Sequence, residues 1–524
     1  MPTSSLFVAQ VSSGCNSCEE TFRHPSMARL MLLTDVGQAP IRSVDPRTGE
    51  PFGPSFADAT VEDVKQVVGY AGAAARELQG LDVGTLAEGL DRAADAVDAA
   101  SHELTRLADR ETALGVDRLT GEVARTTGQM RMFAALIRDG SHLDVVRSKL
   151  PEGAPARTLL RMNLPIGVVG VFAASNFPFA FSVAGGDTAS AIAAGCPVVV
   201  KAHYGHPQTS QRVADLLTEA FAQAGLPEHV FQLIHGGNET GRDLVGHPEL
   251  AAVGFTGSIA GGRALFDLSA RREAPIPVFA EQGSLNPVVL APTALEDPQS
   301  VASALASSIT LGSGQFCTKP GLILLPSDYE TTFVEALRSR VEETGPHILL
   351  TEKIFDGYRA ALDRIGQVLG VDVWTGDYNA EGFSVPAAII RVDQATLASN
   401  DELMTEVFGP ATVVVSVHDV AGLQELLGSM GGHLTGTVHG ASQDPWTRAA
   451  VSGLAPVVGR LIYGGVPTGV AVDIAMHHGG PYPACTSVQH TSVGTAAIRR
   501  FLRPIAYQDM PTELLPTVLT ELAL

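Results

Sequence analysis

Short runs of β-branched residues alternate with helical stretches between residues 165 and 281, and this alternation constrains the fold most. The runs predict five strands: Ile166–Phe172, Pro197–Lys201, Val230–Ile234, Ala251–Phe255 and Pro277–Phe279. Helices centred near residues 190, 216, 242 and 264 are predicted between them. Such alternation is typical of a parallel, doubly wound sheet, which binds ligands beyond the carboxyl ends of its strands. We therefore expect a nucleotide site in this segment.

Two further segments extend this α/β pattern. A second α/β run begins near Pro287, and its strand-like stretches are Val288–Leu290, Leu322–Leu325 and Thr412–Val415. Before the first sheet, a turn is predicted at Asp45–Gly49, and Thr60 and Asp63 form a capping box that opens a series of amphipathic helices up to about residue 139. The chain is thus predicted to be an α/β protein with a second sheet domain.

Composition excludes several classes of protein. The 524 residues include 35 Lys and Arg against 56 Asp and Glu, a net charge of −21, which argues against a nucleic-acid or anionic-membrane partner. The longest apolar stretches, such as Ile166–Ala174, are shorter than the about 18 residues of a membrane span. Five cysteines do not make a disulfide framework, so a reducing, cytoplasmic compartment is expected.

Residues 1–26 are expected to form an N-terminal extension to the folded chain. They lack the basic start and unbroken apolar core of a secretion signal. Cys15 and Cys18 have the spacing of metal ligands, but without a second pair we interpret that spacing as incidental, and no metal site is predicted.

Cys317 is the first candidate for chemistry, because it lies in the Gly-rich stretch from Gly312 to Thr318 at a predicted helix entry. Backbone N–H groups directed at the sulfur there would favour the thiolate and stabilise an oxyanion formed by its attack. The alternative is a buried cysteine that only fills space.

Glu281 and Asn176 are the second and third candidates. Glu281 ends an apolar run, where desolvation should raise its pKa and suit it to act as a base near neutrality. Asn176 follows a predicted strand, and its amide could donate to a developing oxyanion. Taken alone, a helix cap and a turn are the competing interpretations of these two residues.

The nucleotide site has less specific signals. Lys201 ends a predicted strand and faces the ligand crevice, and the stretch Phe255–Ser258 precedes a helix, where N–H groups and hydroxyls could hold a phosphate. Because no GxGxxG motif follows a strand directly, spacing alone leaves open whether the site is non-standard or absent.

Taken together, these stretches resemble the aldehyde dehydrogenase superfamily from about residue 40 to about residue 510. Six ordered motifs carry the resemblance: Asn176–Pro178, Lys201, Phe255–Ser258, Glu281 with Gly283, Gly314–Cys317 and Glu406–Pro410. The stretches His478–Pro483, Thr491–Thr495 and Phe501–Pro504 resemble the branch of bacterial α-ketoglutaric semialdehyde dehydrogenases and NADP-linked fatty aldehyde dehydrogenases.

The resemblance implies a mechanism. Cys317 attacks the aldehyde while Asn176 and the Cys317 backbone N–H hold the oxyanion; hydride passes to the nicotinamide, and water hydrolyses the thioester with Glu281 as base. It also implies a set of cofactor-binding residues: Lys201, Tyr204, Gly257, Ser258, Gln282, Glu406 and Phe408. Lys201 and Glu406 would bind ribose hydroxyls, and Phe408 would pack near the nicotinamide.

The resemblance implies two Rossmann-like domains and a small β element that pairs subunits. Residues 27–144 and 166–281 would form the cofactor domain and 282–487 the catalytic domain, while 145–165 and 488–524 would form the oligomerisation hairpin and C-terminal segment. A homo-oligomer, dimer or tetramer, is the expected state.

Two departures from the family pattern bear on specificity. NAD-preferring relatives often carry an acidic residue three positions after the strand-end lysine, where this chain has Tyr204, so NADP is the expected cofactor, with NAD the alternative. Related semialdehyde dehydrogenases tend to have Asp and Arg where this chain has Ser487 and Gln489. The expected substrate is α-ketoglutaric semialdehyde. The alternatives are a medium or long aliphatic aldehyde, a CoA-acylating reaction and a non-catalytic family member.

Overall fold

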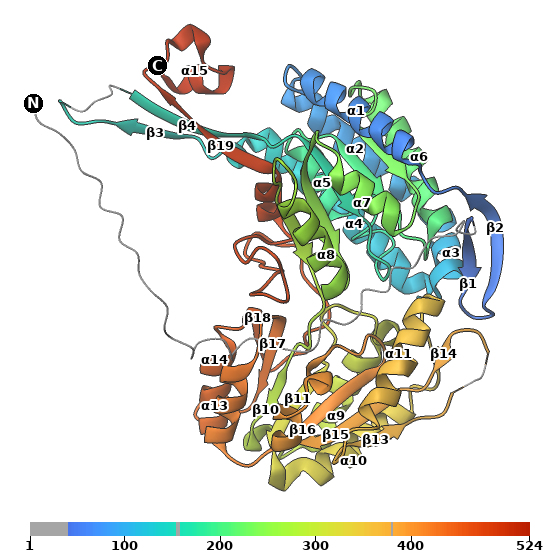
Figure 1. Ribbon diagram of the computed structural model, residues 1–524. Helices are drawn as coiled ribbons and strands as arrows, with labels where there is room; N and C mark the ends of the chain where they lie inside the picture. Colours follow the sequence, from blue (N-terminus) through green and yellow to red (C-terminus); the bar gives the residue numbers. More distant parts are fainter. Residues whose placement is uncertain (1–39, 154–157, 379–380, 524) are drawn as a thin grey trace, which may run out of the picture. The chain divides into compact units, whose positions relative to one another are not determined.

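A five-stranded parallel sheet forms from the segment between residues 165 and 281, as predicted (Figure 1). The computed structural model describes residues 40–153, 158–378 and 381–523. The strand order is β7-β6-β5-β8-β9, and the bounds are β5 Val168–Phe172, β6 Val198–Lys201, β7 Phe231–Ile234, β8 Leu250–Thr256 and β9 Val278–Glu281. The central strand β5 lies between β6 and β8, the reversal of strand order at which a doubly wound sheet opens a ligand crevice.

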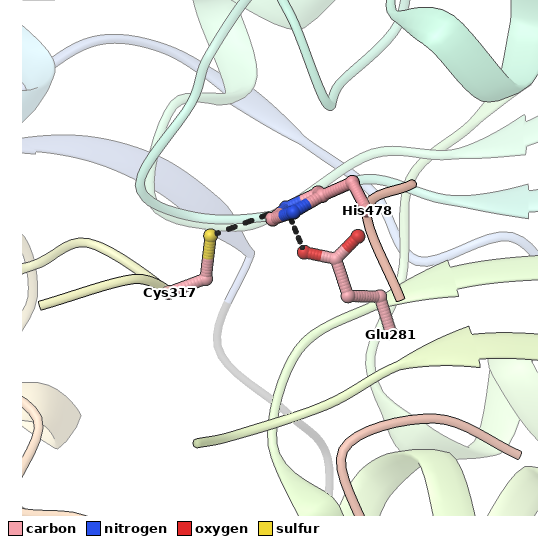
Figure 2. A group of neighbouring side chains, drawn as sticks. All are labelled: Glu281, Cys317 and His478. Atoms are coloured by element: carbon pink, nitrogen blue, oxygen red, sulfur yellow. Dashed lines mark hydrogen bonds and ion pairs between the residues drawn. The ribbon is translucent and has the colours of Figure 1, made fainter. Parts of the chain in front are cut away.

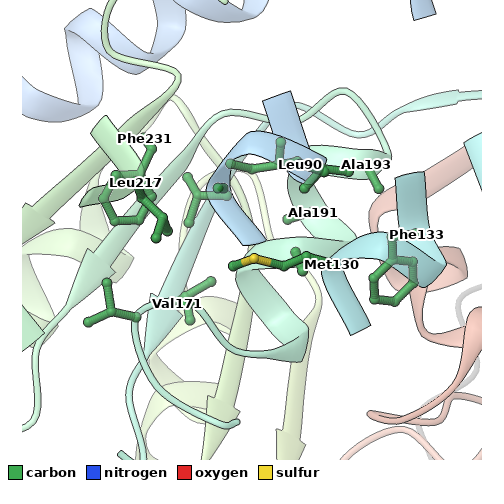
Figure 3. Close-up of a cluster of buried hydrophobic side chains, with 14 of the residues drawn as sticks. Leu90, Met130, Phe133, Val171, Ala191, Ala193, Leu217 and Phe231 are labelled. Atoms are coloured by element: carbon green, nitrogen blue, oxygen red, sulfur yellow. The ribbon is translucent and has the colours of Figure 1, made fainter. Parts of the chain in front are cut away.

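Helices cover both faces of this sheet because the side chains of each strand alternate between faces. Val169 and Val171 of β5 point into one core, with helices α2 (Val83–Ala99), α4 (Val116–Asp139), α5 (Gly186–Ala193) and α6 (Pro207–Gln223) (Figure 3). Val168 and Phe172 point into the opposite core, with α1 (Val61–Leu78), α7 (Asn238–Gly246) and α8 (Ile259–Ala270). Helix α3 (Ser101–Thr112) completes the N-terminal helices.

The predicted helix cap and turn near the N-terminus are both present. Thr60 and Asp63 make a reciprocal capping box at the start of α1. The predicted turn after Asp45 joins two short strands, β1 (Ile41–Asp45) and β2 (Glu50–Phe56), which the sequence analysis did not anticipate.

The second sheet has seven strands in the order β13-β15-β16-β11-β10-β17-β18. All its neighbouring pairs are parallel except β13 with β15. Its strands are β10 Val288–Leu290, β11 Leu322–Pro326, β13 Asp372–Thr375, β15 Ala388–Asp393, β16 Ala411–Val417, β17 His433–His439 and β18 Val458–Tyr463. Its helices are α9 Pro298–Thr310, α10 Glu330–Glu342, α11 Glu352–Ile365, α12 Gln394–Ala398, α13 Val420–Ser429 and α14 Pro445–Leu454. A separate short pair joins β12 (His347–Ile348) to β14 (Ser384–Val385).

A third, antiparallel sheet has the order β19-β4-β3 and joins distant parts of the chain (Figure 1). Its strands are β3 (Val146–Lys149), β4 (Thr158–Pro165) and β19 (Leu502–Gln508), and helix α15 (Thr517–Ala523) follows. Leu502 pairs with Pro165, so the C-terminal strand returns to the hairpin expected near 145–165. Residues 40–524 form one compact unit, and the boundaries within it at 144, 165, 281 and 487 stay a prediction.

Two sequence expectations concern membranes and the N-terminus. Within the part of the chain that the structure describes, no helix combines the length and apolar character of a membrane span. The N-terminal extension, with Cys15 and Cys18, lies outside the described residues.

Candidate active site

Cys317, His478 and Glu281 bring their functional atoms together from three separate parts of the chain (Figure 2). The Cys317 Sγ lies 3.7 Å from Nε2 of His478, and the same nitrogen lies 2.9 Å from Oε1 of Glu281. The imidazole thus stands between the thiol and the carboxylate. His478 and Glu281 are buried, whereas Cys317 is partly exposed. This arrangement allows a proton to move between the thiol and the ring.

A strained turn presents Cys317. Three consecutive residues, Gly312, Ser313 and Gly314, have φ angles of 55°, 58° and 68°, the left-handed region that glycine tolerates best. A methyl group on Gly314 would lie 2.2 Å from the carbonyl oxygen of Gly409, so this turn packs directly against the 409–410 backbone. The predicted helix entry is wrong, because Cys317 lies in a turn between the 3₁₀ helix η3 (Leu311–Gly314) and β11.

The resting state of Cys317 is a thiol, which corrects the expectation of a thiolate. Burial raises the pKa of Cys317 well above its ordinary value, and the negative charge of Glu281 raises it further. The positive charge of Arg125 acts in the opposite direction but does not outweigh them. The sulfur therefore requires a base at the moment of attack, and His478 is within reach.

Glu281 ends strand β9, where it was predicted, but its pKa is lowered and not raised. Burial alone would raise the pKa of the carboxyl group. The charge and hydrogen bond of His478 and the hydroxyl of Ser492 outweigh burial and hold the pKa below its usual value. Glu281 is therefore an ionised, hydrogen-bonded carboxylate at neutral pH.

His478 has no regular secondary structure around it, and loop contacts fix its position. Its backbone N–H donates to Oγ1 of Thr491 at 2.8 Å, and its carbonyl accepts from the N–H of Ser492 at 2.9 Å. The ring of Phe181 lies 6.2 Å from the imidazole. No role was predicted for His478, although it begins the motif His478–Pro483.

Asn176 lies beside the turn that presents Cys317, residues 312–317, which we name the nucleophile turn. It follows strand β5, is buried, and donates through Nδ2 to the carbonyl of Gln315 at 2.9 Å. This bond holds the Asn176 amide against Gln315, two residues before Cys317. The second N–H of the amide is left for another acceptor. The geometry is suited to stabilising an oxyanion formed at Cys317.

Two of the predicted cofactor residues, Lys201 and Tyr204, lie at the carboxyl end of β6 and just after it. Lys201 ends β6, and burial lowers its pKa to about 8 despite the opposing charge of Asp58. Tyr204 is 40% exposed, stacks on His203 with ring centroids 4.5 Å apart, and hydrogen-bonds with Thr351. Burial keeps the pKa of His203 well below its ordinary value, and Lys353 is close enough to lower it further.

Gly257 and Ser258, the predicted phosphate-binding residues, lie at the N-terminus of α8. Gly257 and Ser258 are exposed, and Ser258 caps the helix by accepting from the N–H of Gly261 at 3.2 Å. A helix N-terminus of this kind attracts phosphate through its free N–H groups and its dipole.

Glu406 lies on the segment before β16, and its charge acts on Cys317. Its Oε1 is buried and has no partner among the described residues, so the carboxylate has capacity for a ligand hydroxyl. Burial raises its pKa to about 7, although the charge of Lys319 opposes this. Lys319 holds the segment by donating to the carbonyls of Val407 and Ala411 at 3.1 and 2.6 Å. Phe408, in the same segment, is partly exposed.

Gln282 bonds to protein groups on two sides, and its predicted contact with the cofactor stays a prediction. Its side-chain amide donates to the carbonyl of Pro483 at 2.7 Å and accepts from the N–H of Arg263 at 3.1 Å. Its backbone N–H donates to the carbonyl of Ala484. Through these bonds Gln282 connects α8 to the loop that follows His478.

The divergent stretch after Ala484 contributes packing. Burial raises the pKa of the Cys485 thiol, which makes it a poor nucleophile. Ser487 hydrogen-bonds with His490 at 2.7 Å, and Gln489 is exposed.

The atoms of Glu281, Cys317 and His478 lie within 4.8 Å of one another, so the donor set alone could hold a metal ion. Nε2 of His478 lies 2.9 Å from Oε1 of Glu281, so a proton taken up by the ring would be shared with this carboxylate without a metal.

Comparisons with known proteins show the family of this chain. The model of the aldehyde dehydrogenase family matches residues 34–458. The α-ketoglutaric semialdehyde dehydrogenase 2 of Azospirillum brasilense is 41% identical over 497 residues, 92% of this chain and 93% of that protein. The α-ketoglutaric semialdehyde dehydrogenase of Acinetobacter baylyi is 40% identical over 489 residues, again 92% and 93%. The structure of PnpE in complex with nicotinamide adenine dinucleotide has a TM-score of 0.76 at 21% identity, covering 90% of this chain and 95% of that one. The chain therefore belongs to the aldehyde dehydrogenase family.

Proposed function

We propose that this aldehyde dehydrogenase oxidises α-ketoglutaric semialdehyde to 2-oxoglutarate through a thioester on Cys317. The contact of His478 with both Cys317 and Glu281 is the main structural support for this reaction. It places two groups that can accept a proton beside the nucleophile. The names of the relatives at 41% and 40% identity support the substrate.

His478 activates the nucleophile. The Cys317 Sγ bonds to the aldehyde carbon as its proton moves to Nε2 of His478, and the carbonyl electrons move onto oxygen. The protonated ring then donates to Oε1 of Glu281, whose low pKa keeps the carboxylate charged. Asn176 stabilises the oxyanion through its free N–H.

The residues present fit a nicotinamide dinucleotide. The orphaned Oε1 of Glu406 would accept from a ribose hydroxyl, Lys201 would bind the other ribose, and the N-terminus of α8 would hold phosphate. When bound, the cofactor accepts the hydride that converts the substrate adduct to the thioester.

Glu281 acts in hydrolysis. Its carboxylate removes a proton from water as the water oxygen bonds to the thioester carbon. The carbon–sulfur bond then breaks, the acid departs, and the sulfur leaves as thiolate or takes back a proton from His478.

We further propose NADP as the preferred cofactor. Tyr204 brings no carboxylate to the adenosine ribose, and Lys353 adds a positive charge beside His203. A 2′-phosphate would meet cations there and no repulsion. Changing Tyr204 to Glu should invert the ratio of kcat/KM for NADP and NAD, and a wild-type ratio more than tenfold in favour of NAD would contradict the proposal.

A substrate panel tests the function. The purified chain is given α-ketoglutaric semialdehyde, succinic semialdehyde, glutaraldehyde and decanal with each cofactor, and reduced cofactor and acid product are measured. Equal amounts of reduced cofactor and 2-oxoglutarate are expected, with the highest kcat/KM for α-ketoglutaric semialdehyde. A higher value for decanal would favour the aliphatic alternative, for which the Phe177, Phe181 and Phe316 cluster beside Cys317 is suited. A requirement for CoA would favour the acylating reaction.

The setting of the enzyme is also a proposal. Cys196, Cys317 and Cys485 are free thiols in the described part of the chain, which supports a reducing, cytoplasmic compartment.

A further inference from the structure

Helix α4 places two arginines beside the nucleophile turn, and the proposed chemistry uses neither. Arg118 and Arg125 are seven residues apart, two helical turns, so they lie on one face of the helix. Both side chains are largely buried. Buried cations are expensive unless they are paired or bind a ligand, so their partners are informative.

Arg118 has one anchored and one free nitrogen. Its Nη2 donates to the carbonyl of Asn176 at 2.7 Å, and its Cζ lies 4.7 Å from the ring centroid of Phe316, the residue before Cys317. A methyl group on Gly312 would lie 3.1 Å from its Nη1, so the guanidinium sits directly on the nucleophile turn. That Nη1 is buried and has no hydrogen-bond partner within the described residues.

Arg125 has two free donors. Its Nε and Nη2 are buried and lack partners in the described part of the chain, and its Cζ lies 5.3 Å from the ring centroid of Phe181. Phe181 in turn lies beside His478. The charge of Arg125 acts on both Cys317 and Glu281, which places this guanidinium within electrostatic reach of the reacting groups.

Glu122 lies between the two arginines on the helix and does not neutralise them. Its Oε1 accepts from the N–H groups of Phe179 and Ala180, which fixes the segment after Asn176. Its Oε2 is 4.0 Å from Arg118, longer than a hydrogen bond. Two cations against one engaged carboxylate leave a positive charge and three donor nitrogens without a partner among the described residues.

We propose that Arg118 and Arg125 bind the remote carboxylate of the substrate and thereby select ω-carboxylated aldehydes. The proposal rests on the proposed function. Guanidinium N–H groups match a carboxylate in geometry and charge, and the aromatic rings between them would enclose the methylene chain. Arg460 also interacts electrostatically with Cys317. Its Nη1 and Nη2 donate to the carbonyls of Gly469 and Pro467, so Arg460 positions that loop.

The test compares two five-carbon aldehydes that differ in the carboxylate, 5-oxopentanoate and pentanal. The quantity measured is the ratio of their kcat/KM values in wild type, Arg118→Met and Arg125→Met. Loss of a charge-assisted hydrogen bond should lower this ratio about 10- to 100-fold in each variant. An altered Cys317 pKa affects both aldehydes alike and cancels in the ratio. Arg125→Lys keeps the positive charge but loses the paired N–H donors of the guanidinium. It should therefore recover part of the kcat/KM ratio.

Arg131→Met is the matched control, because Arg131 lies on the same helix but pairs with Asp95 and Asp98 at the surface. Its ratio should equal that of the wild type. A high wild-type ratio that both variants retain, with pentanal oxidation reporting a folded enzyme, would overturn the arginine proposal alone. A wild-type ratio near one would overturn the proposed substrate and this proposal with it.

Discussion

At the scale of single residues, His478 carries the largest consequence, because one imidazole contacts the nucleophile and the carboxylate. We predict that His478→Gln slows the burst of reduced cofactor about 100-fold or more, since a thiol with a raised pKa then lacks its base. Stopped-flow absorbance measures the burst, and iodoacetamide labelling of Cys317 should slow in parallel. His490→Gln is the control, because His490 hydrogen-bonds with Ser487 and not with Cys317. An unchanged burst would remove His478 from the activation step.

Glu281 separates the two halves of the reaction. We predict that Glu281→Gln keeps a burst of reduced cofactor while steady-state turnover falls about 100-fold or more, because water then lacks its base. Rapid-mixing and steady-state assays on one preparation give both rates. Cys317→Ala should abolish both phases. Unchanged steady-state turnover in Glu281→Gln would refute the base role.

Glu406 gives a pH dependence whose sign follows from its raised pKa. Burial moves the pKa to about 7, so the group is an ionised acceptor above that pH and is protonated below it. We predict that KM for the cofactor rises several-fold from pH 8 to pH 6. In Glu406→Gln this dependence should disappear and KM should be high throughout. A flat KM in the wild type would show that Glu406 does not bind the cofactor.

At the scale of elements, strands with a continuous apolar sequence could be predicted and strands with polar buried residues could not. Strand β5 (Val168–Phe172) and its neighbours are β-branched and buried on both faces, so composition reveals them. Strand β17 (His433–His439) is equally buried but contains histidines, threonines and a glycine, so its sequence does not indicate a buried strand. Its burial depends on β10 and β18, which are distant in sequence.

The same limit applies to the site. Cys317, Glu281 and Asn176 carry local signals at strand ends and in a glycine-rich turn. His478 is 161 residues from Cys317 and lies in a loop, so only the fold brings them together. The wrong pKa expectation for Glu281 has the same cause, because the groups that lower its pKa arrive from residues 478 and 492.

The nucleophile turn is an element that tolerates little change. We predict that Gly314→Ala lowers the free energy of unfolding by about 1–3 kcal/mol and reduces kcat at least tenfold, because its φ is +68° and the methyl group would meet Gly409. Denaturant unfolding and a standard assay measure these effects. Gly357→Ala, in helix α11 with open space around it, should raise stability by about 0.5–1 kcal/mol and keep activity. Equal behaviour of the two variants would show that the turn is not constrained.

At the scale of the whole molecule, an acidic chain must hold an anionic cofactor and, in the function proposed above, an anionic substrate. The net charge of −21 repels both at long range. Lys201, Arg118 and Arg125 counter this locally, where burial strengthens each interaction. In this proposal, selectivity for anions resides in a few buried cations within an acidic protein.

The three-stranded sheet supplies the last prediction, an oligomer in solution. Strands β3 and β19 are its outer strands, so each has one edge without a partner in the described chain, and exposed edges invite pairing. Val146 on β3 is 40% exposed. We expect light scattering to give at least twice the mass of one chain, and Val146→Asp to shift the assembly toward monomer by placing a charge in the contact. Val83→Asp, at a 43% exposed valine at the start of α2, should leave the mass unchanged. A monomeric wild type would contradict the oligomer, and an oligomer that Val146→Asp leaves intact would place the contact elsewhere.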